Sequence, residues 1–236
     1  MKKNILKIVG LFFVGIIGGI FADQILWPYF IERPLFYQYG LEQTPIYVTE
    51  REEIIVQENT ALKKAIEKME KTVIGVRTEM YSGKFIEGSG LILTSDGLAV
   101  TLSELIPQGS DFNFFVNGEQ LAFQVVKRKN NLALIKLEKT NLPTVRFADL
   151  DKLKLGERVF LVADIFENTQ PTKIVNEGIV KSFSQDYIKT NIFENYLMAG
   201  SPLFNIEGEA LGLNTIDLEG KVIAIPISQI KQLAGF

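Results

Sequence analysis

The sequence predicts an all-β domain preceded by an apolar N-terminal segment and a short amphipathic helix. From Val73 onward the chain carries about a dozen short apolar stretches, and turn residues separate them. Asn117-Gly118, the strongest type of short-range hairpin signal, joins two of these stretches. Strands at this spacing are typical of a sandwich or a barrel, and two packed barrels of about six strands each fit the count.

The N-terminus has the pattern of a membrane anchor. Three lysines fall within the first seven residues, an uncharged run covers 8–22, and Trp27 follows at the expected outer interface. Counting from Ile5 to the end of this run gives 18 residues, or about 27 Å of helix, close to the thickness of a bilayer core. We expect residues 1–24 to be a single-pass anchor that places the following domain on the extracytoplasmic side. The alternative is a signal peptide cleaved after Ala22.

A connector and a helix are expected before the first strand. Residues 25–58 contain three prolines and are predicted to link the membrane to the domain. The stretch ENTALKKAIEKMEKTV, residues 58–73, is predicted to be helical because Leu62, Ile66 and Met69 fall on one face. We expect this apolar stripe to pack on the body of the domain; a contact with a partner or another copy is the alternative.

Composition excludes several classes of site. The chain has no cysteine, which excludes disulfides, a thiol nucleophile and a cysteine zinc site. It has no histidine, which is the commonest general base at neutral pH and the commonest metal ligand. The net charge of −3 gives no electrostatic reason to expect nucleic-acid binding. No cofactor and no metal site are therefore expected.

The predicted strands follow in order along the chain. Stretches 90–101 and 111–126 are predicted hairpins, and 131–138 is a predicted buried strand. Further strands are expected at 157–165, 172–183, 186–192, 208–216 and 221–227. The last stretch, 228–236, has the pattern of a short closing helix.

Several stretches, taken in order, resemble one protein family. They are GSGLILTSDGLAVTLSELI (88–106), NLALIKLE (131–138), FADLDKLKLGERVFLV (147–162), VNEGIVKSF (175–183) and KTNIFENYLMAGSPLFN (189–205). In this order they resemble the HtrA/DegP family of trypsin-like serine proteases. The resemblance spans residues 59–236 and implies a double six-stranded β-barrel, with barrel one at about 73–145 and barrel two at about 146–236. Most family members carry a PDZ module after the protease domain, and none is expected in this chain.

The family's catalytic positions carry other residues in this sequence. The resemblance puts the general-base histidine position at Glu104, the orienting aspartate position at Asn131 and the nucleophilic serine position at Ala199. The two backbone donors of the oxyanion hole correspond to Leu197 and Ala199. Alanine has no atom that attacks a carbonyl, and a serine mechanism needs a base and a group that orients the base. We therefore expect an inactive homologue of a serine endopeptidase.

The loop around the nucleophile position has two interpretations. In the first, Tyr196, Met198 and Ser201 line a groove between the barrels, in which an unfolded peptide or a protein partner is held without cleavage. In the second, the loop is retained only because the barrel needs its strand–turn–strand geometry.

Two other functions stay open at this stage. One is a residual serine-type endopeptidase with a relocated nucleophile, either Ser201 or Ser103 beside Glu104. The other is a structural subunit that regulates an active HtrA-like protease. The resemblance also implies a homo-oligomer, since family members form trimers. Glu104 has no second ligand at metal spacing near it, so a metal site is not expected there.

Overall fold

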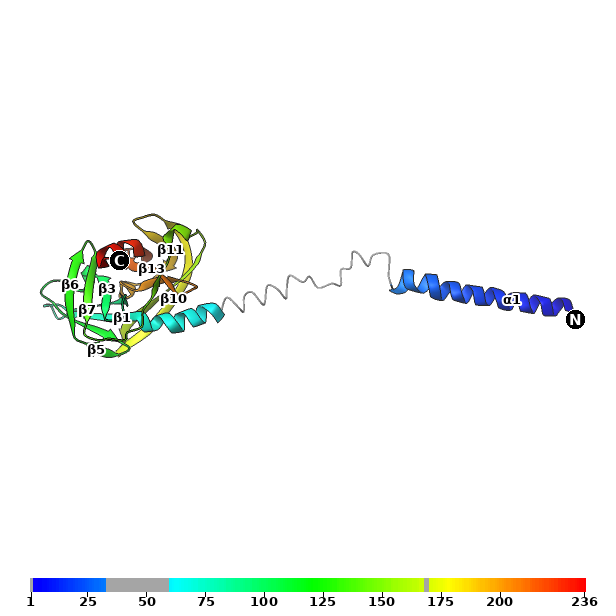
Figure 1. Cartoon of the computed structure of the whole chain (residues 1–236), viewed down its shortest axis with the longest axis horizontal. Coiled ribbons are helices and arrows are strands. Elements are labelled where there is room, and N and C mark those ends of the chain that lie inside the picture. The colour runs from blue at the N-terminus through cyan, green and yellow to red at the C-terminus, as the bar shows by residue number, and fades with distance from the viewer. Residues whose placement is uncertain (1, 33–59, 168–169) are drawn as a thin grey trace. The chain divides into compact units, whose positions relative to one another are not determined.

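The computed structural model describes residues 2–32, 60–167 and 170–236 (Figure 1). The chain divides into two units, Met1–Ile55 and Val56–Phe236, and each is described by itself. Most of the predicted connector, 25–58, lies outside the described residues.

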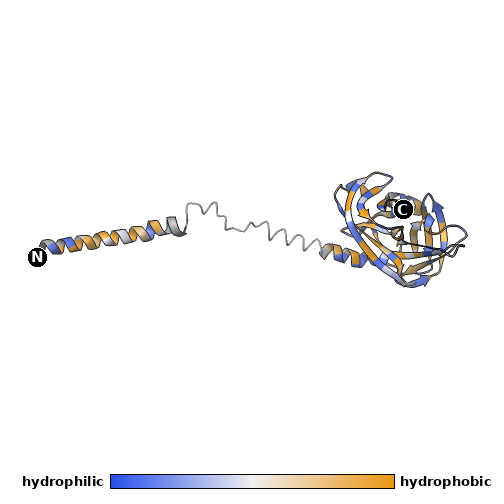
Figure 2. Cartoon of the chain, turned by 180° about the vertical axis from the view of Figure 1, so that it is seen from behind, coloured by the Kyte–Doolittle hydropathy of each residue, from blue (hydrophilic) through white to orange (hydrophobic). Residues whose placement is uncertain are grey.

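The described part of the N-terminal unit is helical. Helix α1 (Lys2–Phe21) continues as a π-helix, η1 (Ala22–Glu32). Within it, Lys7–Trp27 is long and apolar enough to cross a membrane, with a mean hydropathy of 2.0, and orange dominates much of α1 in Figure 2. Its 21 residues correspond to about 31 Å of α-helix. The helix extends past residue 24, the expected end of the anchor, because the apolar run resumes at Ile25.

The C-terminal unit contains two barrel-like sheets. The first has the order β5-β4-β1-β2-β3-β7-β6 and is built from β1 (Val73–Glu79), β2 (Phe85–Ile92), β3 (Leu98–Leu102), β4 (Asp111–Val116), β5 (Glu119–Leu121), β6 (Phe123–Lys129) and β7 (Leu132–Leu137). The second has the order β12-β9-β10-β11-β14-β13-β8, with an additional β12–β13 pairing. Its strands are β8 (Arg146–Phe147), β9 (Arg158–Glu167), β10 (Gln170–Phe183), β11 (Ile188–Phe193), β12 (Pro202–Asn205), β13 (Glu209–Ile216) and β14 (Lys221–Pro226). The predicted all-β, double-barrel fold is confirmed.

The strand count differs from the prediction of six per barrel, because each sheet has seven. In the first sheet, β5 and β6 are one run interrupted only at Ala122. In the second, β8 is a two-residue strand that pairs parallel with β13. Two residues are too few to show any periodicity, so the sequence pattern does not reveal this strand.

Two local predictions are confirmed. Asn117 and Gly118 have φ values of +50° and +83°, as a two-residue hairpin turn of type I′ requires. The closing helix, α3 (Ile227–Ala234), ends at Gly235, whose φ of +86° gives the left-handed conformation typical of a helix C-cap.

The hydrophobic core crosses from one barrel to the other. The larger cluster includes Val76 and Leu91 from the first sheet and Phe160, Phe204 and Leu213 from the second. The Phe160 and Phe204 rings lie 5.3 Å apart, between centroids. A smaller cluster fills the interior of the second barrel. The two barrels therefore form one packed body and not two independent domains.

The amphipathic helix covers residues 60–69 and is followed by a 3₁₀ turn, η3 (Glu70–Thr72). Met69 is buried, and Leu62 and Ile66 pack against the larger cluster. The predicted apolar stripe thus packs on the domain, as expected.

Candidate functional site

The three positions singled out in the sequence lie at the ends of strands. Glu104 is on the 3₁₀ turn η4 (Ser103–Leu105), directly after β3. Asn131 precedes β7, and the Ser103 N–H donates to its carbonyl oxygen at 2.9 Å. Ala199 follows the 3₁₀ turn η6 (Tyr196–Met198) and precedes β12. The first two positions are thus adjacent in the first barrel, and the third belongs to the second barrel.

A close backbone contact brings the second barrel's loop onto the first barrel. The Ser89 N–H donates to the Ala199 carbonyl oxygen at 2.9 Å. A Cβ at Gly88 would lie 2.6 Å from this same oxygen, and a Cβ at Gly200 would lie 2.2 Å from the Ser89 carbonyl oxygen. Gly200 also has a φ of +77°, a conformation that favours glycine. We call this contact between 88–90 and 199–200 the glycine seam.

The loop satisfies its own backbone donors. The Asn195 side chain accepts a hydrogen bond from the Leu197 N–H at 2.9 Å. The Ala199 N–H donates to the Tyr196 carbonyl oxygen at 3.0 Å, and the Ser201 N–H donates to that of Met198 at 3.2 Å. The two N–H groups that the resemblance assigns to an oxyanion hole, at 197 and 199, are therefore both engaged inside the loop.

The side chains of the loop divide into exposed and buried ones. Tyr196 and Leu197 are 44% and 37% exposed. Met198 packs inside the second barrel, and Ala199 and Ser201 are fully buried. Of the three residues expected to line a groove, only Tyr196 presents its side chain to solvent. The 3₁₀ turn turns Met198 inward, which the spacing of the sequence does not show.

Glu104 and Tyr196 face each other from different barrels. The Tyr196 hydroxyl lies close enough to the Glu104 carboxylate for the two groups to interact electrostatically. Partial burial raises the pKa of the Tyr196 phenol, and the negative charge of Glu104 raises it further. Glu104, on the first barrel, therefore lies near the loop of the second.

Ser201 lies in a buried polar pair. Its Oγ accepts a hydrogen bond from the Asn214 Nδ2 at 3.0 Å, and its carbonyl oxygen accepts one from the Asn214 N–H at 2.8 Å. Both residues are fully buried. A carboxamide that donates to a hydroxyl does not act as a base toward it, so this arrangement holds the turn and does not activate the serine.

The comparison with protein families decides the assignment. Residues 88–213, more than half of the chain, match the family described as a trypsin-like peptidase domain. The chain belongs to this family.

Relatives of this trypsin-like peptidase domain carry HtrA and DegP names. The chain is 30% identical over 187 residues to the serine protease HTRA1A of Danio rerio, covering 71% of this chain and 39% of that one. It is 30% identical over 139 residues to a probable periplasmic serine endoprotease DegP-like of Pseudomonas putida, covering 54% and 28%. The predicted resemblance to HtrA/DegP is confirmed, although the chain spans well under half of these relatives' length.

The fold comparison agrees with this assignment. The crystal structure of the serine endoprotease from Yersinia pestis superposes with a TM-score of 0.65 and 23% identity, covering 74% of this chain and 65% of that one. In the part of the trypsin-like chain that the structure describes, no three acidic residues gather as a metal site would require. A cavity of about 900 Å³ is lined by α3, by the β10–β11 turn and by Asn130 and Leu132, on either side of Asn131. Glu104 and Ala199 do not line it.

Proposed function

We propose that this chain is a membrane-anchored, HtrA-like member of the trypsin-like peptidase family that binds unfolded polypeptide segments or a protein partner without cleaving them. The main support is that the two backbone N–H groups at the oxyanion positions already donate hydrogen bonds within the loop. Both donate inside the loop, from Leu197 to Asn195 and from Ala199 to Tyr196. An N–H that is already engaged does not stabilise the oxyanion of a tetrahedral intermediate.

The residue types support the same conclusion. In serine proteases, losing the nucleophile or the base costs about 10⁶-fold in turnover, and removing one oxyanion donor costs about 10²–10³-fold. In this chain, Ala199 supplies no nucleophile, and the sequence contains no histidine at all. Glu104, at the base position, faces the Tyr196 phenol and not an imidazole. Restoring one group alone would therefore not restore hydrolysis.

The exposed side chains of the loop support binding. Tyr196 and Leu197 present apolar surface, and Phe193, just before the loop, is 60% exposed. Unfolded polypeptides expose the apolar side chains that such a surface buries, and their backbone pairs with an exposed strand edge. Glu104 across from Tyr196 adds a hydrogen-bond acceptor to this face.

The proposal includes an organisation for the chain. Residues 1–24 are the membrane anchor, 25–58 the connector and 59–236 the pseudoprotease domain, on the extracytoplasmic side. The apolar span over Lys7–Trp27, with lysines on its N-terminal side, supports this orientation. Fusing a reporter that is active on only one side of the membrane to either end tests the orientation.

A binding assay on the full-length chain in detergent micelles tests the function. Fluorescently labelled unfolded peptides are titrated and followed by anisotropy, and the same samples are then run on a gel. We expect saturable binding, intact peptides, and a loss of affinity of about fivefold or more in Leu197→Asp. Leu155→Asp, at a site 67% exposed and outside the loop, is the matched control and leaves the affinity unchanged.

Each contrary result has a defined meaning. Fragments that vanish in Ser201→Ala would establish a relocated endopeptidase instead. An absence of binding would mean that the loop is kept for the barrel's geometry. Co-purification of an active HtrA-like protease from native membranes, with no peptide binding, would indicate the regulatory subunit.

A further inference from the structure

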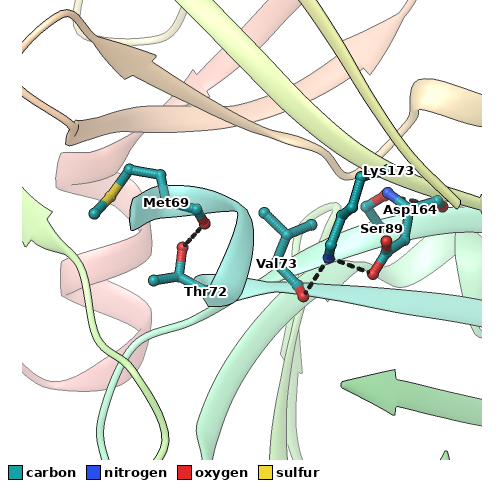
Figure 3. A network of polar contacts seen from close by, with 6 residues as sticks. All are labelled: Met69, Thr72, Val73, Ser89, Asp164 and Lys173. Atoms are coloured by element: carbon teal, nitrogen blue, oxygen red, sulfur yellow. Dashed lines mark hydrogen bonds and ion pairs between the residues drawn. The ribbon is translucent and has the colours of Figure 1, made fainter. Parts of the chain in front are cut away.

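A partly buried ion pair of the second barrel also contacts the first barrel. Asp164 on β9 lies directly opposite Lys173 on β10, and its side chain is 3% exposed. The Lys173 Nζ lies 2.8 Å from the Asp164 carboxylate and 3.2 Å from the Val73 carbonyl oxygen, at the start of β1 (Figure 3). Lys173 therefore connects the second barrel to the first strand of the first barrel.

The same aspartate is connected to the loop through Ser89. The Asp164 N–H donates to the Ser89 Oγ at 2.8 Å, and the Ser89 hydroxyl faces the Asp164 carbonyl oxygen at 3.3 Å. The backbone N–H of Ser89 in turn donates to the Ala199 carbonyl oxygen at 2.9 Å. A chain of hydrogen bonds thus runs from Lys173 to the loop that carries Tyr196 and Leu197.

Charges and burial act in opposite directions on the Asp164 carboxylate. Burial raises its pKa and is the larger effect, while Lys173 lowers it and Glu70, on η3, raises it slightly. As the pH falls, Asp164 therefore takes up a proton at a higher pH than an ordinary aspartate does. The folded state binds this proton more tightly than the unfolded state does. Protonation of Asp164 therefore breaks the ion pair without lowering the free energy of unfolding.

The surroundings give the lysine room to move once the pair is broken. Asp164 and Lys173 line a cavity of about 270 Å³ together with Glu70, Asn117, Gly118 and Pro171. Lys173 is 25% exposed, so its side chain reaches solvent. When Asp164 is neutral, the remaining anion on this cavity is Glu70, toward which the ammonium group turns, and its bond to Val73 is lost.

We propose that Asp164 and Lys173 form an acid-sensitive clamp between the barrels, which regulates the binding face around Tyr196 and Leu197. This inference rests on the proposed binding function. Protonation of Asp164 releases Lys173 from Val73, and the strain passes through Ser89 to the backbone of Ala199. The loop then moves relative to the first barrel, and a polypeptide bound across both barrels is released.

The first test is hydrogen exchange on the full-length chain in detergent micelles at pH 7 and at pH 4, near the ordinary pKa of an aspartate, corrected for the intrinsic pH dependence of exchange. We expect the Ser89 amide, which is bonded to Ala199, to lose protection at pH 4 in the native chain and not in Asp164→Asn. Asp96→Asn is the matched control, because Asp96 pairs with Lys136 at the surface and its pKa is lowered. Equal protection at both pH values in the native chain overturns the clamp.

The second test is peptide affinity at the same two pH values. We expect affinity to fall about fivefold or more on acidification in the native chain and in Asp96→Asn, and to be independent of pH in Asp164→Asn. The same fall in Asp164→Asn overturns the regulatory role. If peptides bind at neither pH, the proposed function fails, and the Ser89 exchange alone decides the clamp.

Discussion

Replacing Gly200 by alanine tests how tightly the glycine seam holds the barrels together. Gly200 has a φ of +77°, and an added Cβ would lie 2.2 Å from the Ser89 carbonyl oxygen. The left-handed conformation costs an alanine about 1–2 kcal/mol. The overlap with backbone atoms adds about 1–3 kcal/mol, because Ser89 is held in β2 and the Gly200 N–H is bonded to the Asn214 carbonyl oxygen, so neither segment moves without disturbing its own hydrogen bonds. We therefore expect a loss of about 2–5 kcal/mol in the free energy of unfolding.

Gly118→Ala separates the two contributions to this loss. Gly118 has a φ of +83°, and no atom lies within 4 Å of the point that an added Cβ would occupy. Its replacement by alanine costs only the conformational term, about 1–2 kcal/mol. Gly200→Ala is expected to exceed it by about 1–3 kcal/mol, or roughly 2–12 °C in Tm for a domain of this size.

Urea unfolding of the full-length chain in detergent, followed by the β-sheet circular dichroism signal, measures both variants. Tryptophan fluorescence does not serve this purpose, because the single tryptophan, Trp27, is in the N-terminal helix and not in the domain. Equal losses in Gly200→Ala and Gly118→Ala would refute the reasoning, since they would show that the contact between the barrels accommodates a methyl group.

Three further predictions concern other contacts. Glu104→Gln lowers the pKa of the Tyr196 phenol toward its usual value, because the negative charge is removed while the burial persists. Alkaline absorbance titration measures this pKa, with Tyr196→Phe to identify the signal, and an unchanged pKa contradicts the prediction. Lys173→Met leaves Asp164 buried without a partner and costs about 3 kcal/mol at pH 7. This loss diminishes as the pH falls, because the raised pKa of Asp164 lets the folded state bind a proton at a higher pH than the unfolded state does. Urea unfolding at pH 7 and pH 4 that shows no such recovery contradicts this prediction. Met69→Ala lowers the free energy of unfolding, measured in urea, by about 2–5 kcal/mol, because Met69 is 1% exposed. A loss under about 0.5 kcal/mol would mean that the helix over 60–69 does not pack on the domain.

The fold was accessible from sequence because its signals are local. The Asn117-Gly118 turn and the alternation of apolar residues in β11, whose side chains are alternately buried and exposed, both act within a few residues. The packing of Met69 follows from the helical spacing of its stripe. The division of one strand at Ala122 and the two-residue strand β8 carry no such local signal.

The candidate site was only partly accessible, because its contacts join residues far apart in the chain. Glu104 and Tyr196 meet only when the barrels are packed, and no spacing rule links them. Asp164 and Lys173 are cross-strand neighbours, but their burial depends on the first barrel covering them. Met198 was expected to line a groove, but its side chain is buried because residues 196–198 form a 3₁₀ turn, which the sequence pattern does not predict.

The glycine seam has a consequence for how this domain tolerates change. The bonds that hold Ala199 in place use its N–H and its carbonyl oxygen, and their partners are the backbone atoms of Tyr196 and Ser89. Every amino acid except proline offers the same two groups. The backbone bonds of the loop therefore do not depend on which side chain stands at 199, whereas the complete burial of that position restricts it to small residues. Small side chains of different chemistry, reactive or inert, are interchangeable there while the two glycines keep the barrels joined.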